Sequence, residues 1–350
     1  MQEKRISRGI RLGKLAIGGG APVMVQSMTN TDTRDVEATL AQIDRLVRRG
    51  CEAVRVAVPD MTAAKALRAL RDGSPVPLIA DIHFDYRLAL AALEAGLEGL
   101  RINPGNIGPR EHVDRVVDAA KANGAVIRVG VNSGSVEKHL LQKYGGPCVE
   151  AMVESALSHV RMLEDRGFYD TKISLKSSSV LDTIAAYRLL AKSCDYPLHI
   201  GVTETGPVRQ GLIKSAMGIG ALLLDGIGDT LRVSLTDDPV EEVYAAKDIL
   251  KAAGLRRDGV DIISCPTCGR TRIDLIGLVN QVDAALKDCQ KPITVAVMGC
   301  VVNGPGEARE ADIGIAGGKG EAVLFLHGKP VKKLTGDNIL DQFMDEIYKL

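Results

Sequence analysis

The chain has 350 residues, 45% of them hydrophobic and 25% charged, as expected for a globular protein rather than a disordered or fibrous one. Lys plus Arg and Asp plus Glu each number 44, which excludes a general basic surface for nucleic acid. Seven cysteines, no apolar leader and no apolar run near the roughly 20 residues of a membrane span favour a cytoplasmic protein.

One pattern, an apolar run followed by a helical period, recurs along residues 1–258. The predicted strands are 22–30, 53–60, 77–84, 99–106, 126–134, 171–179, 197–206 and 230–237. Helices are predicted over 35–50, 85–96, 110–124, 149–167, 180–193 and 239–254. Eight such units in about 250 residues predict a (β/α)8 TIM barrel, whereas the alternative, a doubly wound open sheet, usually stops at five or six strands. Residues 10–17, which three glycines follow, predict a hairpin that caps the bottom of the barrel.

The pattern changes after the barrel. A helix is predicted over 270–286, and a strand over 292–302 that runs into a Gly/Pro loop. Residues 312–315 and 322–327 predict paired strands, and 337–350 predict a final helix. We therefore divide this α/β protein into a barrel domain, 1–258, and a small α/β domain, 259–350.

Five strand positions carry a cation in the same phase. They are Arg55, Arg101, Arg128, Lys176 and Arg232. Since side chains alternate along a strand and the β-branched neighbours face the helices, these cations point into the barrel. An unpaired charge there costs several kcal/mol, and Asp81 has the phase to neutralise only part of it. The excess predicts a polyanionic ligand, most simply a diphosphate; internal ion pairs that stabilise the barrel are the alternative.

Further polar residues lie at the strand ends, where barrel active sites occur. The candidates are His83, Asn103, Asn132, Ser174 and Glu204, and the loops 103–108 and 130–134 offer amides for phosphate oxygens. Glu204 has the parity of Ile200 and Val202, so strict alternation points it outward, and only a bend would aim it inward. The helical or loop residues His112, His139 and His159 are expected at the surface.

Three cysteines of the second domain have the spacing of metal ligands. Cys265 and Cys268 form a CxxC turn, and Cys300 precedes a Gly/Pro loop that leads to Glu307. Such thiolates suit an iron–sulfur cluster or zinc. Cys289 forms no second close pair, and we expect it to be a buried or surface thiol rather than a ligand. The barrel cysteines Cys51, Cys148 and Cys194 are expected to be packing residues.

On seven motifs the chain resembles the 4-hydroxy-3-methylbut-2-enyl diphosphate synthase family in its short, two-domain bacterial form. The motifs are VQSMTNT (25–31), ADIH (80–83), RINPGNIG (101–108), RVGVN (128–132), GVTETG (201–206), SCPTCG (264–269) and GCVVNGPGE (299–307). The resemblance implies an iron–sulfur oxidoreductase of isoprenoid biosynthesis that acts on CH or CH2 groups. It would open the ring of 2-C-methyl-D-erythritol 2,4-cyclodiphosphate to give 4-hydroxy-3-methylbut-2-enyl diphosphate, with two electrons consumed and water lost.

The resemblance also implies roles for single residues. One [4Fe–4S] cluster per chain would be held by Cys265, Cys268, Cys300 and Glu307, with Glu307 also catalytic. Diphosphate contacts would come from Arg55, Arg101, Arg128, Asn132, Lys176 and Arg232. Glu204 would be the catalytic acid of the barrel. Family members form homodimers in which the cluster domain of one chain closes over the barrel of the other, and flavodoxin or ferredoxin would donate the electrons; no nucleic acid or membrane is expected.

Two other functions remain open from the residues alone. A barrel aldolase with a structural zinc module would need a Schiff-base lysine, for which Lys176 is the candidate. An iron–sulfur electron carrier would leave the five inward cations unexplained.

Overall fold

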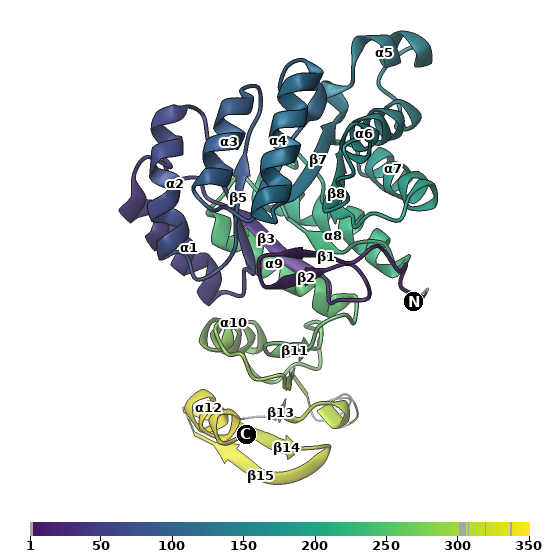
Figure 1. The fold of residues 1–350 in the computed structure, drawn as a ribbon. Coiled ribbons are helices and arrows are strands. Elements are labelled where there is room, and N and C mark those ends of the chain that lie inside the picture. The colour runs from purple at the N-terminus through teal and green to yellow at the C-terminus, as the bar shows by residue number, and fades with distance from the viewer. Residues whose placement is uncertain (1–2, 301–305, 307, 319, 337) are drawn as a thin grey trace. The chain divides into compact units, whose positions relative to one another are not determined.

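The computed structural model describes residues 3–300, 306, 308–318, 320–336 and 338–350 (Figure 1). The chain divides into two compact units, Met1–Arg256 and Arg257–Leu350, and each has a hydrophobic core of its own. Among the helices of the described residues, none has the length and apolar character needed to cross a membrane.

Eight parallel strands form the sheet of the first unit. They are β3 (Met24–Met28), β4 (Ala53–Ala57), β5 (Leu78–Asp81), β6 (Gly99–Ile102), β7 (Val126–Asn132), β8 (Thr171–Lys176), β9 (His199–Ile200) and β10 (Thr230–Leu231). Their order is β8-β7-β6-β5-β4-β3-β10-β9, and a parallel bridge from Ile173 to Leu198 joins β8 to the start of β9. Because the two outer strands meet, the predicted barrel is confirmed and the open sheet is excluded.

Helices surround these strands, as Figure 1 shows. They are α1 (Val36–Arg48), α2 (Met61–Gly73), α3 (Tyr86–Glu94), α4 (Arg110–Asn123), α5 (Lys138–Tyr144), α6 (Val149–Glu164), α7 (Val180–Ser193), α8 (Val208–Leu224) and α9 (Pro239–Ala252). Their ends follow local chemistry: the Asp35 side chain accepts from the Ala38 N–H at the start of α1, and Gly124 ends α4 at a φ of 61°. All six predicted helices are confirmed.

The alternation of side chains separates a helix-facing core from the barrel interior. Val54, Val56, Leu100 and Ile102 belong to the core beneath the helices. A separate apolar cluster joins the hairpin β1 (Ile10–Leu12) and β2 (Leu15–Ile17) to the first residues of β3, β4 and β7. The predicted hairpin therefore closes the N-terminal end of the barrel, and polar chemistry is left to the C-terminal end.

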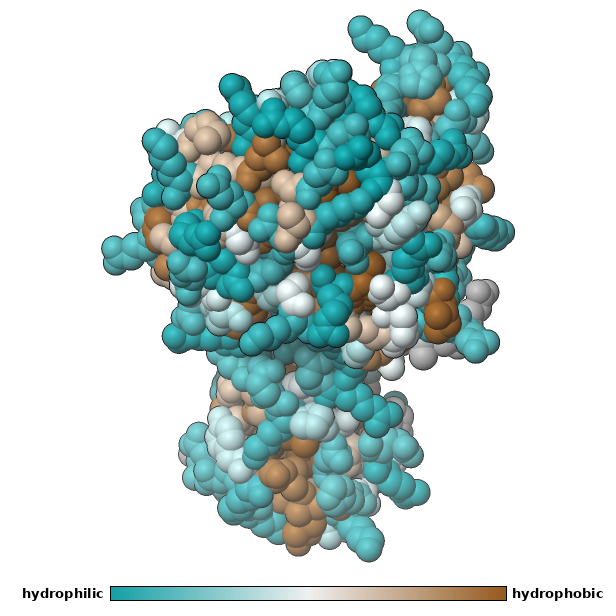
Figure 2. All heavy atoms as spheres, viewed as in Figure 1, coloured by the Kyte–Doolittle hydropathy of each residue, from teal (hydrophilic) through white to brown (hydrophobic). Residues whose placement is uncertain are grey.

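The outer surface of the protein is polar where it can be seen. On the face drawn in Figure 2, hydrophilic residues predominate and apolar residues form small separate groups. This is the expected surface for helices whose apolar stripes pack on a sheet.

The second unit is a five-stranded mixed sheet in the order β11-β12-β13-β14-β15. Its strands are β11 (Asp261–Ser264), β12 (Thr294–Met298), β13 (Ile313–Gly317), β14 (Glu321–Leu326) and β15 (Lys329–Thr335); its helices are α10 (Leu275–Leu286) and α12 (Ile339–Lys349). The strands β11, β12 and β13 are parallel, whereas β14 and β15 are antiparallel to their neighbours.

Neither edge strand of this sheet was predicted from the sequence. β11 is mostly exposed and β15 carries three lysines, because an edge strand keeps one side in water. The helix predicted from residue 270 begins at Leu275, since the Asp274 side chain caps it by accepting from the Gly277 N–H.

Candidate active site

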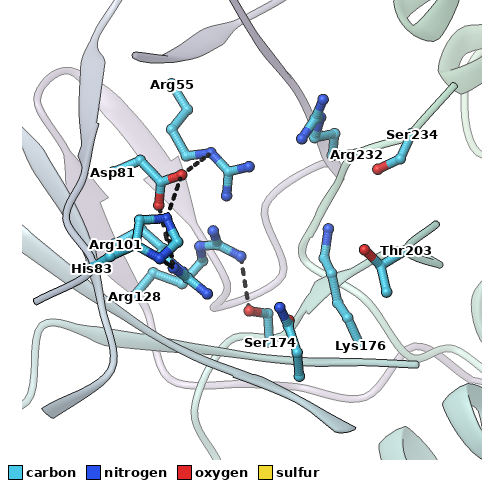
Figure 3. A pocket seen from close by; sticks show the side chains of 11 residues that line it. Arg55, Asp81, His83, Arg101, Arg128, Ser174, Lys176, Thr203, Arg232 and Ser234 are labelled. Carbon is cyan, nitrogen blue, oxygen red and sulfur yellow. Dashed lines mark hydrogen bonds and ion pairs between the residues drawn. The ribbon is translucent and has the colours of Figure 1, made fainter. Parts of the chain in front are cut away.

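A cavity of about 130 Å³ opens inside the barrel (Figure 3). It is lined by Arg55, Asp81, His83, Arg101, Arg128, Asn132, Ser174, Lys176, Thr203, Arg232 and Ser234. These residues lie on, or directly after, seven of the eight barrel strands, at or near their C-terminal ends. The cavity thus occupies the position where barrel enzymes carry their active sites.

The cavity brings together nine of the ten residues predicted to bind substrate. The tenth, Asn103, is buried outside the lining, and its amide nitrogen and oxygen have no hydrogen-bond partner among the described residues. Sequence reasoning missed Thr203 and Ser234. Both have the inward phase, two residues beyond Gly201 and Arg232. Thr203 has an apolar neighbour on one side only, and Ser234, although it lies between Val233 and Leu235, carries no charge that would mark it.

One carboxylate lies among two arginines and a histidine. Asp81 Oδ2 is 3.7 Å from Arg55 Nε and 3.5 Å from His83 Nε2, and its Oδ1 is 3.5 Å from Arg101 NH1. Burial alone would raise the pKa of Asp81, but Arg55, the His83 hydrogen bond and Arg101 together hold it well below its usual range. Asp81 therefore stays ionised and orients the two guanidinium groups.

A second carboxylate reaches the cavity wall from a helix. Glu242 of α9 accepts from Arg232 NH2 at 3.0 Å and from Arg232 Nε at 3.1 Å, a bidentate pair. Met28 Sδ accepts from Arg55 NH2 at 3.0 Å and contacts Arg232 as well. No sequence pattern points to Glu242, because a helix residue has no inward strand phase.

Arg128 is the least neutralised of the arginines. It is 1% exposed, its NH1 donates to Ser174 Oγ at 2.7 Å, and its Nε and NH2 have no partner within the described chain. Burial, then Arg55 and Arg101, lower the pKa of Arg128, and burial lowers the pKa of Arg55 to about 10. Internal ion pairs therefore account for only part of the positive charge, and the remainder favours an anion in the cavity.

Two glycines leave room for these long cations. A Cβ at Gly201 would lie 2.5 Å from the Arg232 carbonyl oxygen and 3.2 Å from Lys176 Nζ. A Cβ at Gly130 would lie 2.9 Å from Arg101 Nε. Any side chain at either position would displace a cation that lines the cavity.

Glu204 does not line the cavity; it is exposed at the bend after β9. Its φ is 52°, in the left-handed region, where a residue with a side chain is strained by roughly 1–3 kcal/mol. Neighbours hold the loop in place: Thr203 N–H donates to the Ser177 carbonyl at 3.3 Å, and Thr205 Oγ1 donates to the Ser234 carbonyl. The chain therefore bends at Glu204, so strand alternation does not fix the direction of its side chain, which is exposed.

The expectation that His159 lies at the surface is wrong. It is 2% exposed on α6, and its Nε2 lies 2.6 Å from Glu137 Oε1, in the segment that follows β7. Burial lowers the pKa of His159, and Glu137 opposes this only in part. The pair ties the connection after β7 to the barrel wall.

In the second unit, the predicted cysteine ligands follow two neighbouring strands. Cys265 Sγ accepts from Gly299 N–H at 3.3 Å, next to Cys300, and Arg270 has its pKa raised by Cys268 and Cys300. The backbone N–H and side chain of Arg270 lower the pKa of Cys268, which favours its thiolate. Because β11 and β12 are parallel, their C-terminal ends lie together, and the cysteines that follow them meet at that end of the sheet.

The ligand set is incomplete in the described residues, where no three His, Cys, Asp or Glu side chains form a group ready to hold a metal. Glu307 and residues 301–305 lie outside them. Cys289 precedes β12 whereas Cys300 follows it, so the two cysteines lie at opposite ends of a strand about 16 Å long. The thiol chemistry fits a soft metal centre, and Cys289 lies at the wrong end of the sheet to join it.

Comparison with known proteins gives matches along nearly the whole chain. The GcpE TIM-barrel domain matches residues 7–247, and the GcpE protein C-terminal domain matches residues 261–349. A protein of Lawsonia intracellularis is 64% identical over 351 residues, covering 100% of this chain and 98% of that protein. One of Geobacter sulfurreducens is 60% identical over 347 residues, covering 99% and 98%. Both are named 4-hydroxy-3-methylbut-2-en-1-yl diphosphate synthase (flavodoxin).

Similar solved structures add evidence for the fold alone. Dihydropteroate synthase of Yersinia pestis matches with a TM-score of 0.50 at 14% identity, covering 72% of this chain and 100% of its own. 3-Dehydroquinate dehydratase of Geobacillus kaustophilus matches with a TM-score of 0.51 at 16% identity, covering 71% and 98%. Identities this low carry no information about chemistry.

Proposed function

The chain belongs to the GcpE family, and on that premise we propose that it reductively opens the ring of 2-C-methyl-D-erythritol 2,4-cyclodiphosphate. The product is 4-hydroxy-3-methylbut-2-enyl diphosphate, a precursor of isoprenoids. The observation that carries the proposal is the excess of buried cations around the barrel cavity. A cyclic diphosphate has one ionised oxygen on each phosphorus, and such an anion would neutralise part of this charge.

The cavity residues bind and orient the diphosphate in this proposal. Arg55, Arg101 and Arg128 present planar guanidinium groups that suit two phosphate oxygens at once. Ion pairs with Asp81 hold Arg55 and Arg101 in position. The remaining polar contacts would come from Asn132, Ser174, Lys176, Thr203, Arg232 and Ser234.

The reaction also needs electrons, which no barrel side chain supplies. We propose one [4Fe–4S] cluster per chain, held by Cys265, Cys268, Cys300 and Glu307; when bound, it supplies the two electrons singly. Two observations support this set: the three cysteines follow the C-terminal ends of β11 and β12, and the pKa of Cys268 is lowered. Because the names of the relatives include flavodoxin, we propose flavodoxin rather than ferredoxin as the donor.

Glu204 is assigned the proton step. Ring opening breaks the C2–O bond and leaves its oxygen on the phosphate, while the C3 hydroxyl departs as water and a C2–C3 double bond forms. The balance requires two electrons and one proton. Its strained bend next to Thr203, which lines the cavity, supports Glu204 as the acid that would deliver that proton to the hydroxyl.

We also propose a cytoplasmic homodimer with shared active sites. The cysteines form no disulfide in the described structure, which suits a reducing compartment. The anion cavity belongs to one compact unit and the cysteine ligands to the other. In the family arrangement, each site combines the barrel of one chain with the second unit of its partner.

Shared sites predict complementation between two impaired variants, assayed at a substrate concentration too low to saturate the Arg128→Ala site. A heterodimer of a Cys300→Ser chain with an Arg128→Ala chain should regain one intact site, about half of the wild-type turnover per dimer. The control is a heterodimer of wild type with the chain that carries both substitutions, which should have no intact site. Verified Cys300→Ser/Arg128→Ala heterodimers without activity would contradict shared sites.

Loss of Arg128 should weaken substrate binding. We expect Arg128→Ala to cost roughly 1.5–3 kcal/mol, because it removes charged hydrogen bonds in a buried site. Arg128→Lys should restore little of this, since a lysine cannot form the bidentate contact. Calorimetry with the oxidised enzyme measures the dissociation constant, and the exposed Arg188→Ala on α7 is the control. Wild-type affinity in Arg128→Ala would remove this residue from the site.

One anaerobic assay tests the function itself. The purified protein, the cyclic diphosphate and a strong one-electron reductant should give the linear diphosphate. The protein should contain about four iron and four sulfide per chain. One zinc per chain and no product would instead favour the aldolase with a structural zinc module.

A further inference from the structure

A lysine lies deeper in the barrel than the cavity and has no role in the function proposed above. Lys172 precedes Ser174 by two residues on β8, so its side chain shares the inward phase of Ser174 and Lys176. It is 1% exposed, it does not line the cavity, and its Nζ has no hydrogen-bond partner among the described residues. A buried ammonium without a partner is unfavourable, so its position needs an explanation.

The charged groups around Lys172 inside the barrel are mostly positive. Its Cα is the register partner of that of Arg128 on β7. His199 on β9 is fully buried and bonds through Nδ1 to Thr230 Oγ1 at 2.8 Å, and Gln26 on β3 is a neutral amide. The other titratable groups that line the cavity are Arg55 (β4), Asp81 (β5), His83 (after β5), Arg101 (β6), Lys176 (β8) and Arg232 (after β10). Asp81 is the only carboxylate of that set, and Glu242 is bound to Arg232 from outside.

Among these crowded cations, the lysines are the ones that can lose a proton, because an arginine stays protonated in a protein. Burial first, and then the charges of Arg128 and Arg55, lower the pKa of Lys172 to about 7. Burial also lowers the pKa of His199, so that ring stays neutral at neutral pH. Burial first, and then Arg128 and Arg232, also lower the pKa of Lys176, but this lysine lines the cavity and would contact the ligand directly. Lys172 is thus the group beneath the ligand whose charge is free to change.

We propose that Lys172 is a positioning residue that takes up a proton from solvent when the diphosphate binds above it. The inference rests on the proposed function, since it needs a diphosphate in the cavity. The anion neutralises Arg128 and Arg55, which removes much of the repulsion that keeps Lys172 uncharged. The proton adds to the Nζ lone pair, and the ammonium then adds a positive charge beneath the bound anion. Ring opening gives the diphosphate one more ionised oxygen, and the positive charge of the Lys172 ammonium would offset this additional negative charge.

The affinity for the diphosphate should therefore depend on pH. Below about pH 7, Lys172 is already protonated in the free protein, so binding takes up no proton there. Above pH 7, the free protein holds it neutral and the complex holds it charged. The affinity should fall as the pH rises, by up to tenfold per pH unit, until the pKa of Lys172 in the complex is reached.

Calorimetry of the oxidised holoenzyme without reductant tests this. The cyclic diphosphate is titrated anaerobically at pH 6 and pH 8, in buffers of different ionisation enthalpy, to count the protons taken up. The ligand has no ionisation in this range, so the protons go to the protein. Wild type should take up nearly one proton more per chain at pH 8 than at pH 6. Lys172→Met should lose that proton, and the exposed Lys192→Met on α7 should keep it.

Two results would overturn the proposal. Equal proton uptake by wild type at pH 6 and pH 8 would do so without any variant, so the test stands even if Lys172→Met does not fold. Undiminished uptake in a folded Lys172→Met protein would assign the proton to another group. If wild type does not bind the cyclic diphosphate at all, the proposed function fails instead.

Discussion

Cys268→Ser should reduce turnover to background and lower the iron content, while the barrel binds the cyclic diphosphate as before. A serine hydroxyl is a far poorer ligand for iron than a thiolate, and Cys268 has an environment that favours the thiolate. Its side chain is exposed, so the substitution removes little packing. Iron and sulfide analysis, visible absorption and an anaerobic assay measure the first two effects, and calorimetry measures the third.

Cys289→Ser is the matched control. Cys289 packs at the edge of the second core, at the other end of β12 from Cys300, so its loss should leave the cluster and turnover intact. A full iron content in Cys268→Ser, or loss of the cluster in Cys289→Ser, would show that the ligand set is wrong. Weakened diphosphate binding in Cys268→Ser would show that the anion site is not confined to the barrel.

The inward arginines could be predicted because their neighbours reveal the strand phase. In Val54-Arg55-Val56 and Ile127-Arg128-Val129, a single cation stands between two residues that prefer the helix-facing core. Most of the cavity lining is explained by this alternation and by the closure of the barrel. The same argument identifies the strand ends as the place for the ligand.

The features that could not be predicted depend on contacts between distant elements. Lys172 comes directly after Thr171, so its segment lacks the flanking apolar residues that mark the inward arginines. Glu242 reaches Arg232 from a helix, and His159 is buried because Glu137, far away in the chain, partners it. Neither of these two contacts leaves a periodic signal, because each depends on how helices pack around the barrel.

The position of Glu204 shows how strand parity fails at a bend. Ile200 and Val202 are buried, as alternation requires, and Val202 lies against α8, since a Cβ added at Gly218 would approach its side chain to 2.5 Å. Two residues later, the left-handed φ of Glu204 breaks the phase. A strained non-glycine residue persists where its surroundings hold it, and such residues cluster at functional sites.

Glu204→Gln should lower kcat by about 10²–10⁴, the usual contribution of a positioned acid, with substrate affinity and cluster content unchanged. Glutamine keeps the size and hydrogen-bonding capacity of the side chain but does not donate the proton that departing water requires. An anaerobic assay at saturating substrate measures kcat, and calorimetry without reductant measures affinity. Glu111→Gln, exposed in the first turn of α4, is the control.

Glu204→Gly separates the carboxylate from the strained backbone. Glycine adopts a φ of 52° without a steric penalty, so this variant should be at least as stable as wild type in thermal unfolding. It should nevertheless be as inactive as Glu204→Gln, because both lack the acid. If Glu204→Gln turned over normally while Glu204→Gly did not, the side chain would serve only to shape the loop, and the proton would have to come from another group.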